Sequence, residues 1–226
     1  MNQEIEILDG SSTTLRSTTR LVEVDRPVGS HRPTKSEEDL LEIRWHGRGG
    51  QGVKTAAMLF AETAIEEGKY AQGSPEYGPE RMGAPTKGYT RISSQTILSH
   101  SSITEPDVVI VLDPTLLENP EIVEGIPDNG ILIVNTSKSP GEIRKELNLV
   151  GRRIFTVNGT QLALDTLGKA IPNTVMLGAL IRVSKVFDLA TMEKNIVKKF
   201  EKKYNEQVAD MNIRAIRRAY EEVQGE

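Results

Sequence analysis

The stretch that most constrains the fold is a glycine-rich segment between a strand pattern and a helical pattern. Residues 45–56 read WHGRGGQGVKTA, in which Gly47–Gly52 matches G-x-G-x-x-G. Residues 41–45 before it form a short apolar strand. After it, apolar residues recur at helical spacing over residues 53–65, and Gly68 is placed to end that helix. A strand, a glycine turn and a helix in this order are the context of nucleotide-binding α/β folds.

The rest of the chain alternates between strand and helix patterns. Three segments rich in β-branched residues have the composition of strands buried on both faces; they are Asp107–Leu112, Ile131–Asn135 and Arg153–Val157. Helical patterns lie between and after them, over 115–123, 141–147 and 161–169. This alternation predicts the α/β class, with an open, mostly parallel, Rossmann-like sheet and helices on both faces.

The C-terminal third is predicted to be helical. Asn173 is the expected N-cap of a helix over 174–187 that is apolar on most sides. Such a helix is buried, either in its own domain or at an interface. Residues 190–224 are charged and amphipathic. We therefore expect residues 41–226 to form one α/β domain with a helical C-terminal part.

Residues 1–40 have a different composition, rich in Ser, Thr, Arg and Pro, with an apolar piece at Leu21–Val24. Such a segment cannot bury enough apolar surface to order itself. It is either a tail or an extended N-terminal arm that orders against a partner subunit, with Leu21–Val24 as its anchor. The predicted organisation is an arm over 1–40 followed by the domain over 41–226.

Composition and charge exclude several classes of function. The net charge is −4 and aromatic residues make up 4% of the chain, which argues against nucleic acid as a partner. The absence of cysteine removes disulfides, thiolate nucleophiles and iron–sulfur ligation from this chain. No apolar run is long enough to span a membrane, and the N-terminus lacks a secretory pattern. We expect a cytoplasmic protein that does not contact membranes.

The glycine motif alone does not identify a ligand. A dinucleotide site needs an acidic residue at the end of the second strand, about 20 residues on, but the first acid in that region is Glu76, between Pro75 and Pro79. A P-loop needs a lysine directly after the last glycine, whereas Val53 precedes Lys54 here. The motif is therefore a dinucleotide site that lacks the usual acidic residue, a site for another anion or a phosphate tail at a helix N-terminus, or a tight structural turn.

A second conspicuous stretch is the long connection over residues 73–93, GSPEYGPERMGAPTKGYTRIS, which ends in a strand pattern at Gly88–Ser93. Long structured loops in compact domains are usually functional. Glu76, Glu80 and Arg81 either form internal ion pairs on a rigid surface loop or belong to a recognition surface.

Other polar residues carry weaker signals. The histidines, at positions 31, 46 and 100, lack metal-ligand spacing, and His46 beside the glycine motif is more readily structural than catalytic. Asp113, Asn135 and Asn158 follow predicted strands, where α/β sheets place ligands, but each is first of all a candidate helix N-cap.

Several motifs in order resemble a known family. GRGGQGV, SPEYGPERMGAP, TRIS, PDVVIVLDP and NTVMLGAL resemble the gamma subunit of the 2-oxoacid:ferredoxin oxidoreductases, of the pyruvate:ferredoxin oxidoreductase (pyruvate synthase) type. The resemblance covers residues 41 to about 185 and leaves out the arm. Ketoisovalerate, 2-oxoglutarate, indolepyruvate and oxalate enzymes of the same family share this domain.

The resemblance implies a subunit of an enzyme that decarboxylates a 2-oxoacid on thiamine diphosphate and Mg²⁺ and passes electrons through 4Fe–4S clusters to ferredoxin, with coenzyme A as co-substrate. This chain has neither cysteines nor a thiamine motif, so these cofactors are expected on alpha, beta and delta-type subunits. No catalytic residue and no metal ligand is expected on this chain. The candidate binding residues are Gly47, Arg48, Gly49, Gly50, Gln51, Gly52, Glu76, Glu80 and Arg81. The alternative is a stand-alone nucleotide-binding regulatory protein.

Overall fold

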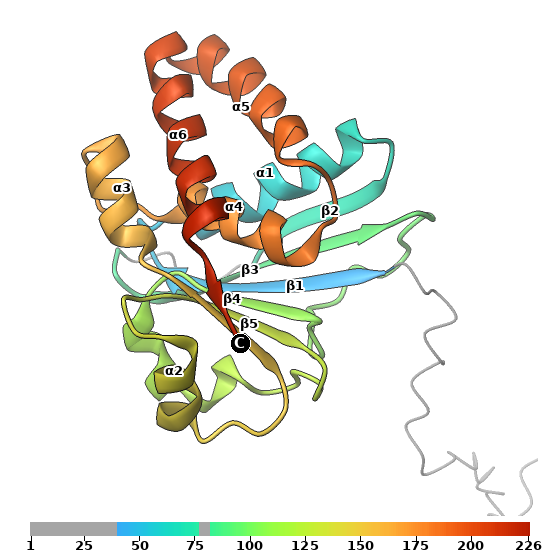
Figure 1. Ribbon diagram of the computed structural model, residues 1–226. Helices are drawn as coiled ribbons and strands as arrows, with labels where there is room; N and C mark the ends of the chain where they lie inside the picture. The colour runs from blue at the N-terminus through green and yellow to red at the C-terminus, as the bar shows by residue number, and fades with distance from the viewer. Residues whose placement is uncertain (1–39, 77–81) are drawn as a thin grey trace, which may run out of the picture. The chain divides into compact units, whose positions relative to one another are not determined.

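The central strands alternate their side chains between two apolar cores, one on each face of a sheet. The computed structural model describes residues 40–76 and 82–226 (Figure 1). Of the predicted arm, all but residue 40 lies outside the described residues. One core contains Val108, Ile110 and Ile133, and the other contains their neighbours Val109 and Leu132. The alternation follows from the period of two in a β-strand.

Seven strands of the described chain form one sheet in the order β2-β3-β1-β4-β5-β6-β7. They are β1 (Leu41–Arg48), β2 (Tyr70–Pro75), β3 (Pro85–Ser93), β4 (Val108–Val111), β5 (Ile131–Asn135), β6 (Arg153–Val157) and β7 (Gln224–Gly225). The pairs β1–β4, β4–β5 and β5–β6 are parallel, while β3 pairs antiparallel with both β1 and β2, and β7 with β6. β2 therefore runs in the direction of β1, and β3 and β7 run against the others. The predicted mostly parallel α/β sheet is confirmed.

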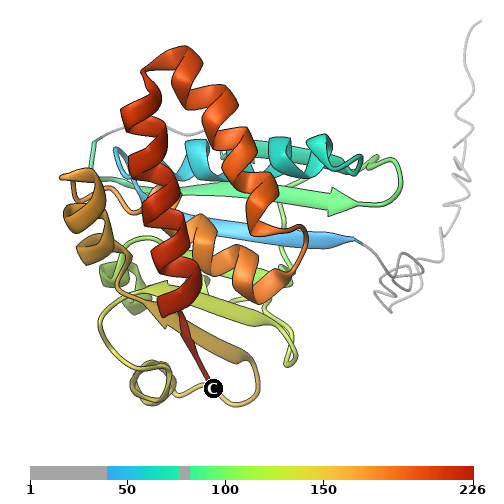
Figure 2. The same cartoon turned by 45° about the horizontal axis from the view of Figure 1, so that its top comes forward.

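Helices cover both faces of the sheet (Figures 1 and 2). The helices are α1 (Val53–Glu66), α2 (Pro140–Leu147), α3 (Gly159–Leu167), α4 (Asn173–Ser184), α5 (Leu189–Lys203) and α6 (Glu206–Glu222), with two 3₁₀ helices, η1 (Pro114–Glu118) and η2 (Pro120–Ile122). Residues of α1, α3, α4, α5 and α6 share one core with the sheet, while α2, η1 and η2 pack on the opposite face. The C-terminal part is helical, as predicted, and it adds a second helical layer over α1 and α4.

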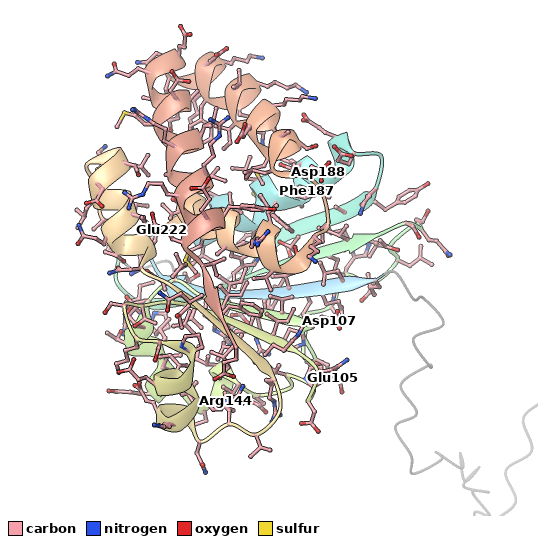
Figure 3. All side chains as sticks on the ribbon, viewed as in Figure 1. Glu105, Asp107, Arg144, Phe187, Asp188 and Glu222 are labelled. Carbon is pink, nitrogen blue, oxygen red and sulfur yellow. The ribbon has the colours of Figure 1, made fainter. Side chains whose placement is uncertain are left out.

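The apolar helix α4 is buried within its own domain rather than left for an interface. Its residues from Val175 to Leu180 are inaccessible to solvent. The crossing with α6 is close: a Cβ on Gly178 would lie 2.1 Å from the carbonyl oxygen of Ile216. In Figure 3, Phe187 lies in the link between α4 and α5, and its ring centroid is 4.8 Å from that of Phe60 in α1.

Some predicted elements were wrong in detail. The helix predicted over 115–123 is instead two 3₁₀ helices, because Asn119 precedes a proline and is extended, with ψ of 118°. Asn173 is not an N-cap: it is the first residue of α4, the cap is Pro172, and no side chain caps this end. The amphipathic stretch over 190–224 breaks into α5 and α6, and Asn205 caps α6.

Candidate functional site

The glycine turn over Gly47–Gly52 connects the carboxyl end of β1 to α1. Gly50 and Gly52 have φ of +96° and +79°, in the left-handed region that favours glycine. Gly52 is also crowded, because a Cβ there would lie 2.4 Å from Nδ2 of Asn173 at the start of α4. Both residues are thus needed for the turn itself, whatever it binds.

A network of side chains holds the turn against the end of β4. The Gln51 amide donates to Oδ2 of Asp113 (2.7 Å), which also lies 3.3 Å from Nε of Arg48. Arg48 donates further to Thr115 Oγ1 (2.8 Å) and to the carbonyl of Gly83 (3.1 Å). Its guanidinium is thereby already committed to partners within the chain.

Asp113 is held in its charged form by this network. Its partial burial acts to raise the pKa, but hydrogen bonds from Thr115 and Gln51, together with the charge of Arg48, bring the pKa below its usual value. The Thr115 backbone N–H donates to Asp113 Oδ1 (3.0 Å), so Asp113 also caps η1. The expected N-cap role is confirmed, and the carboxylate is occupied by the turn and the cap.

Backbone amides of the turn are also used internally. The N–H of Arg48 donates to Oε1 of Gln51 (2.8 Å), that of Gly49 to the carbonyl of Ala84 (2.8 Å), and that of Gln51 to the carbonyl of Arg48 (3.0 Å). An anion at this turn would have to use the other amides, those of Gly50 and Gly52 and those of the first turn of α1. That turn contains Lys54 and no acidic residue.

The long connection contains a strand that the sequence analysis missed. β2 occupies Tyr70–Pro75, so Glu76 lies outside a strand, as expected, but directly follows one. Its carboxylate accepts a hydrogen bond from the Tyr89 hydroxyl (3.2 Å), and its N–H donates to the carbonyl of Lys87 (3.0 Å). Because β3 lies between β2 and β1, Glu76 is separated from the glycine turn by two strand spacings, or about 10 Å.

Two other candidate residues, Glu80 and Arg81, lie outside the described residues. The described chain resumes at Met82, whose sulfur would lie 3.2 Å from a Cβ on Gly50. The end of the long connection therefore reaches the glycine turn. The structure brings together the candidates from Gly47 to Gly52 and leaves Glu76 apart from them.

His46 belongs to a buried polar cluster on the face of the sheet that η2 covers, opposite the face on which α1 packs. Its Nε2 accepts a hydrogen bond from Nε of Arg44 (2.9 Å), and Nη2 of Arg44 donates to the carbonyls of Glu121, Ile122 and Glu124. Burial, and then the charges of Arg44 and Lys87, lower the pKa of His46 to about 3. This geometry supports a structural role for a neutral His46.

Arg44 is a structural partner of His46 that the sequence analysis missed. Burial lowers its pKa, and it anchors the turn after η2 through main-chain carbonyls. The signal was present: Arg44 and His46 alternate with Ile43 and Trp45 along one strand, which places both polar residues on the same face.

The other strand ends are stabilised locally. Asn158 caps α3 by accepting from the N–H of Gln161 (3.2 Å), as expected. Asn135 does not cap the helix that follows it. It instead accepts from the N–H of Thr160 (3.0 Å) and donates to the carbonyl of Leu112 (2.7 Å), so it ties three strand ends together.

The described residues contain neither a metal-binding group nor a membrane-spanning helix. Residues 40–76 and 82–226 contain no group of three or more His, Asp or Glu side chains arranged to hold a metal ion. Within the same ranges, none of the helices combines the length and the hydropathy needed to cross a membrane.

Comparison with known proteins identifies the family. Residues 42–222 match the family model described as pyruvate ferredoxin/flavodoxin oxidoreductase. The chain is 50% identical to pyruvate synthase subunit PorC of Thermotoga maritima over 80% of this chain and 94% of that protein. It is 43% identical to the pyruvate/ketoisovalerate oxidoreductases common subunit gamma of Pyrococcus abyssi, over 82% of this chain and 98% of that one.

A solved structure shows the same fold. The crystal structure of pyruvate oxidoreductase subunit PORC from Thermotoga maritima matches with a TM-score of 0.74 and 46% identity, covering 83% of this chain and 99% of that chain. The order of the motifs, the sheet with its glycine turn and the agreement over nearly the whole length of these relatives lead to one conclusion. The chain belongs to the pyruvate ferredoxin/flavodoxin oxidoreductase family, among its gamma-type subunits.

Proposed function

We propose that this chain is the gamma subunit of a pyruvate synthase. Such an enzyme converts pyruvate and coenzyme A to acetyl-coenzyme A and CO₂ while reducing ferredoxin, or carries out the reverse synthesis. The observation that carries the proposal is the 50% identity to the Thermotoga maritima PorC subunit, which extends over 94% of that protein. The family match over residues 42–222 spans the glycine turn and the helices of the C-terminal part.

We assign the redox and decarboxylation cofactors to partner subunits. This chain contains no cysteine, and cysteine thiolates hold iron–sulfur clusters. It also lacks the G-D-G segment and following asparagine of a thiamine diphosphate site. Thiamine diphosphate, Mg²⁺ and 4Fe–4S clusters then belong to alpha, beta and delta-type subunits, which also deliver electrons to ferredoxin. The cytoplasmic location stays a prediction from the sequence.

The choice of 2-oxoacid rests on the names of the relatives. The Pyrococcus abyssi relative is named as a subunit common to pyruvate and ketoisovalerate oxidoreductases. A subunit shared between two substrates is expected if the contacts that select the substrate lie on other chains. The alternative is therefore the gamma subunit of a ketoisovalerate, 2-oxoglutarate, indolepyruvate or oxalate enzyme, and the substrate range of the assembled enzyme distinguishes them.

Assembly is the direct test of the subunit role. Purified alone, the chain is expected to be colourless and unable to reduce ferredoxin with pyruvate, because it supplies neither clusters nor thiamine diphosphate. A tagged copy expressed in its own host should co-purify with cluster-containing alpha, beta and delta-type subunits and with pyruvate-dependent activity. Active pyruvate synthase that lacks this chain, or a tagged chain recovered without such partners, would contradict the proposal.

Within this role, we propose that the glycine turn borders the path of coenzyme A, with Lys54 as its electrostatic partner. Arg48 is less suited to that role because Asp113, Thr115 and the carbonyl of Gly83 already engage its guanidinium. Lys54 is exposed in the first turn of α1, where the helix dipole also favours an anion.

Steady-state kinetics of the assembled enzyme test the proposed contact of Lys54 with coenzyme A. Lys54→Gln is expected to raise KM for coenzyme A about threefold, the effect of losing one exposed charge contact, with KM for pyruvate unchanged. Lys202→Gln, on the exposed side of α5, is the matched control. Gly50→Val should instead reduce assembly and leave kinetics per complex normal, because valine is strained at φ of +96°. An unchanged KM for coenzyme A in Lys54→Gln would leave the turn a structural role only.

A further inference from the structure

A pocket between α1 and α5 lies on the flank of α1 and reaches its first turn, directly after the glycine turn. The two helices are joined by ion pairs of Glu66 with Lys198 and of Glu62 with Lys199. Toward the start of α1 they flank a half-open pocket of about 390 Å³. This volume is within the range of pockets that hold small organic ligands. The cavity is lined by Lys54, Thr55, Met58, Leu59, Glu62, Lys199, Phe200, Lys203 and Tyr204.

The floor of the pocket is apolar and partly aromatic. Leu59 is buried and Met58 partly exposed on α1, and Phe200 faces them from α5. The ring of Tyr204 packs beside that of Phe200, with centroids 5.8 Å apart and planes inclined by 46°. Tyr204 is 56% exposed, so part of its ring is accessible to a flat aromatic group. Aromatic rings favour offset or edge contacts with such a group.

The rim of the pocket is positively charged on a chain whose net charge is −4. Lys54, Lys199 and Lys203 line it against one carboxylate, that of Glu62. Glu62 is already paired with Lys199, and Lys203 lies over the Tyr204 ring, 5.3 Å from its centroid. Lys54 and Lys203 are both exposed, and an added anion has to compete only with the exposed cation–π contact of Lys203, worth about 0.5–1 kcal/mol.

We propose that this pocket binds a phosphorylated molecule with a flat aromatic ring, of about the size of a mononucleotide. The ring packs on Tyr204 and the apolar floor, and the phosphate lies between Lys54 and Lys203. A free nucleotide and the nucleotide end of coenzyme A share this chemistry, and either would occupy the site in the same way. For coenzyme A this proposal deepens the proposed function, whereas binding of a free nucleotide does not rest on it; Lys54 serves both proposals, and Lys203 and Tyr204 belong to this one alone.

Calorimetric titration of the isolated full chain tests the proposal with three probes: ADP, coenzyme A and inorganic phosphate. We expect saturable binding of ADP or coenzyme A with a Kd below about 1 mM, and weaker binding of inorganic phosphate, which lacks the ring. Binding of ADP alone indicates a free nucleotide, whereas tighter binding of coenzyme A identifies the nucleotide end of that molecule. Failure of both to bind, or equal affinity for inorganic phosphate, would overturn the proposal.

Variants locate the binding in this pocket. Lys54→Gln and Lys203→Gln should each weaken binding of the nucleotide probe about threefold to tenfold, and more strongly at low salt, because each removes one charge contact. Tyr204→Leu should weaken the nucleotide probe and leave inorganic phosphate unaffected. Lys202→Gln, one residue from Lys203 and outside the pocket lining, is the control. Unchanged thermal melting without ligand shows that each variant is folded, and equal weakening in Lys202→Gln would place the binding elsewhere.

Discussion

Replacing Gly178 with alanine is expected to lower the free energy of unfolding by about 3 kcal/mol, near the upper end of the usual cost of overpacking. The added methyl group would lie 2.1 Å from the Ile216 carbonyl oxygen and 3.0 Å from the backbone nitrogen of Tyr220. Both atoms belong to the backbone of α6, so no side-chain rotation relieves the contact. α6 must move away from α4, which opens the core beneath it.

Urea unfolding of the isolated chain measures the effect, with the midpoint shifted at a constant slope. Gly141→Ala is the matched control, because Gly141 also lies in a helix and a Cβ there meets no atom within 4 Å. That change should be neutral or stabilising by up to about 1 kcal/mol. Equal stability of Gly178→Ala and the wild type would show that the two helices are not packed as closely as described.

The wild type is expected to lose roughly 2–3 kcal/mol of stability between pH 7 and pH 4.5 through His46 alone. The folded protein keeps this side chain neutral down to a pKa of about 3, whereas an unfolded histidine takes up a proton below about pH 6.5. Between these values the unfolded state binds more protons, so stability falls as the pH falls. The stability that depends on a neutral His46 is fully present above about pH 6.5.

His46→Gln isolates this contribution. Glutamine can still accept the hydrogen bond from Arg44 but does not titrate, so the pH dependence of its unfolding should be flatter by up to one proton. His100→Gln replaces an exposed histidine and should follow the wild type. The measurement is urea unfolding at a series of pH values from 7 to 4.5. Identical slopes for the wild type and His46→Gln would show that the folded protein protonates His46 as readily as the unfolded chain does.

The parts of the fold that were predictable are those specified by local composition. The strands β5 and β6 have the predicted bounds, because β-branched runs buried on both faces are a strong local signal. β2 was missed because its sequence, YAQGSP, contains Gln, Gly and Pro, which favour turns over strands. Only pairing with β3 makes this segment a strand, and that pairing is a tertiary contact.

The same distinction applies to the candidate site. The glycines of the turn were predictable, because the turn and the helix start are adjacent in sequence. The bond of Gln51 with Asp113 joins residues 62 positions apart, and nothing near either residue predicts it. The same Asp113 also engages Arg48, whose charge the sequence alone left available for an anion.

The antiparallel strand β3 has a consequence for how motifs are used. A rule that looks for an acidic residue a fixed number of positions after G-x-G-x-x-G assumes that the next strand in the chain is also the neighbour in the sheet. Here β1 lies between β4 and β3, and the next strand in the chain, β2, is not its neighbour; β3 begins beside the turn, with Pro85 opposite Arg48. Any scan that counts residues will report Glu76 at nearly the right interval and mistake this chain for a dinucleotide binder. Designing such a binder on this scaffold would require the carboxylate at the start of β3, a position that no count from the glycines would select.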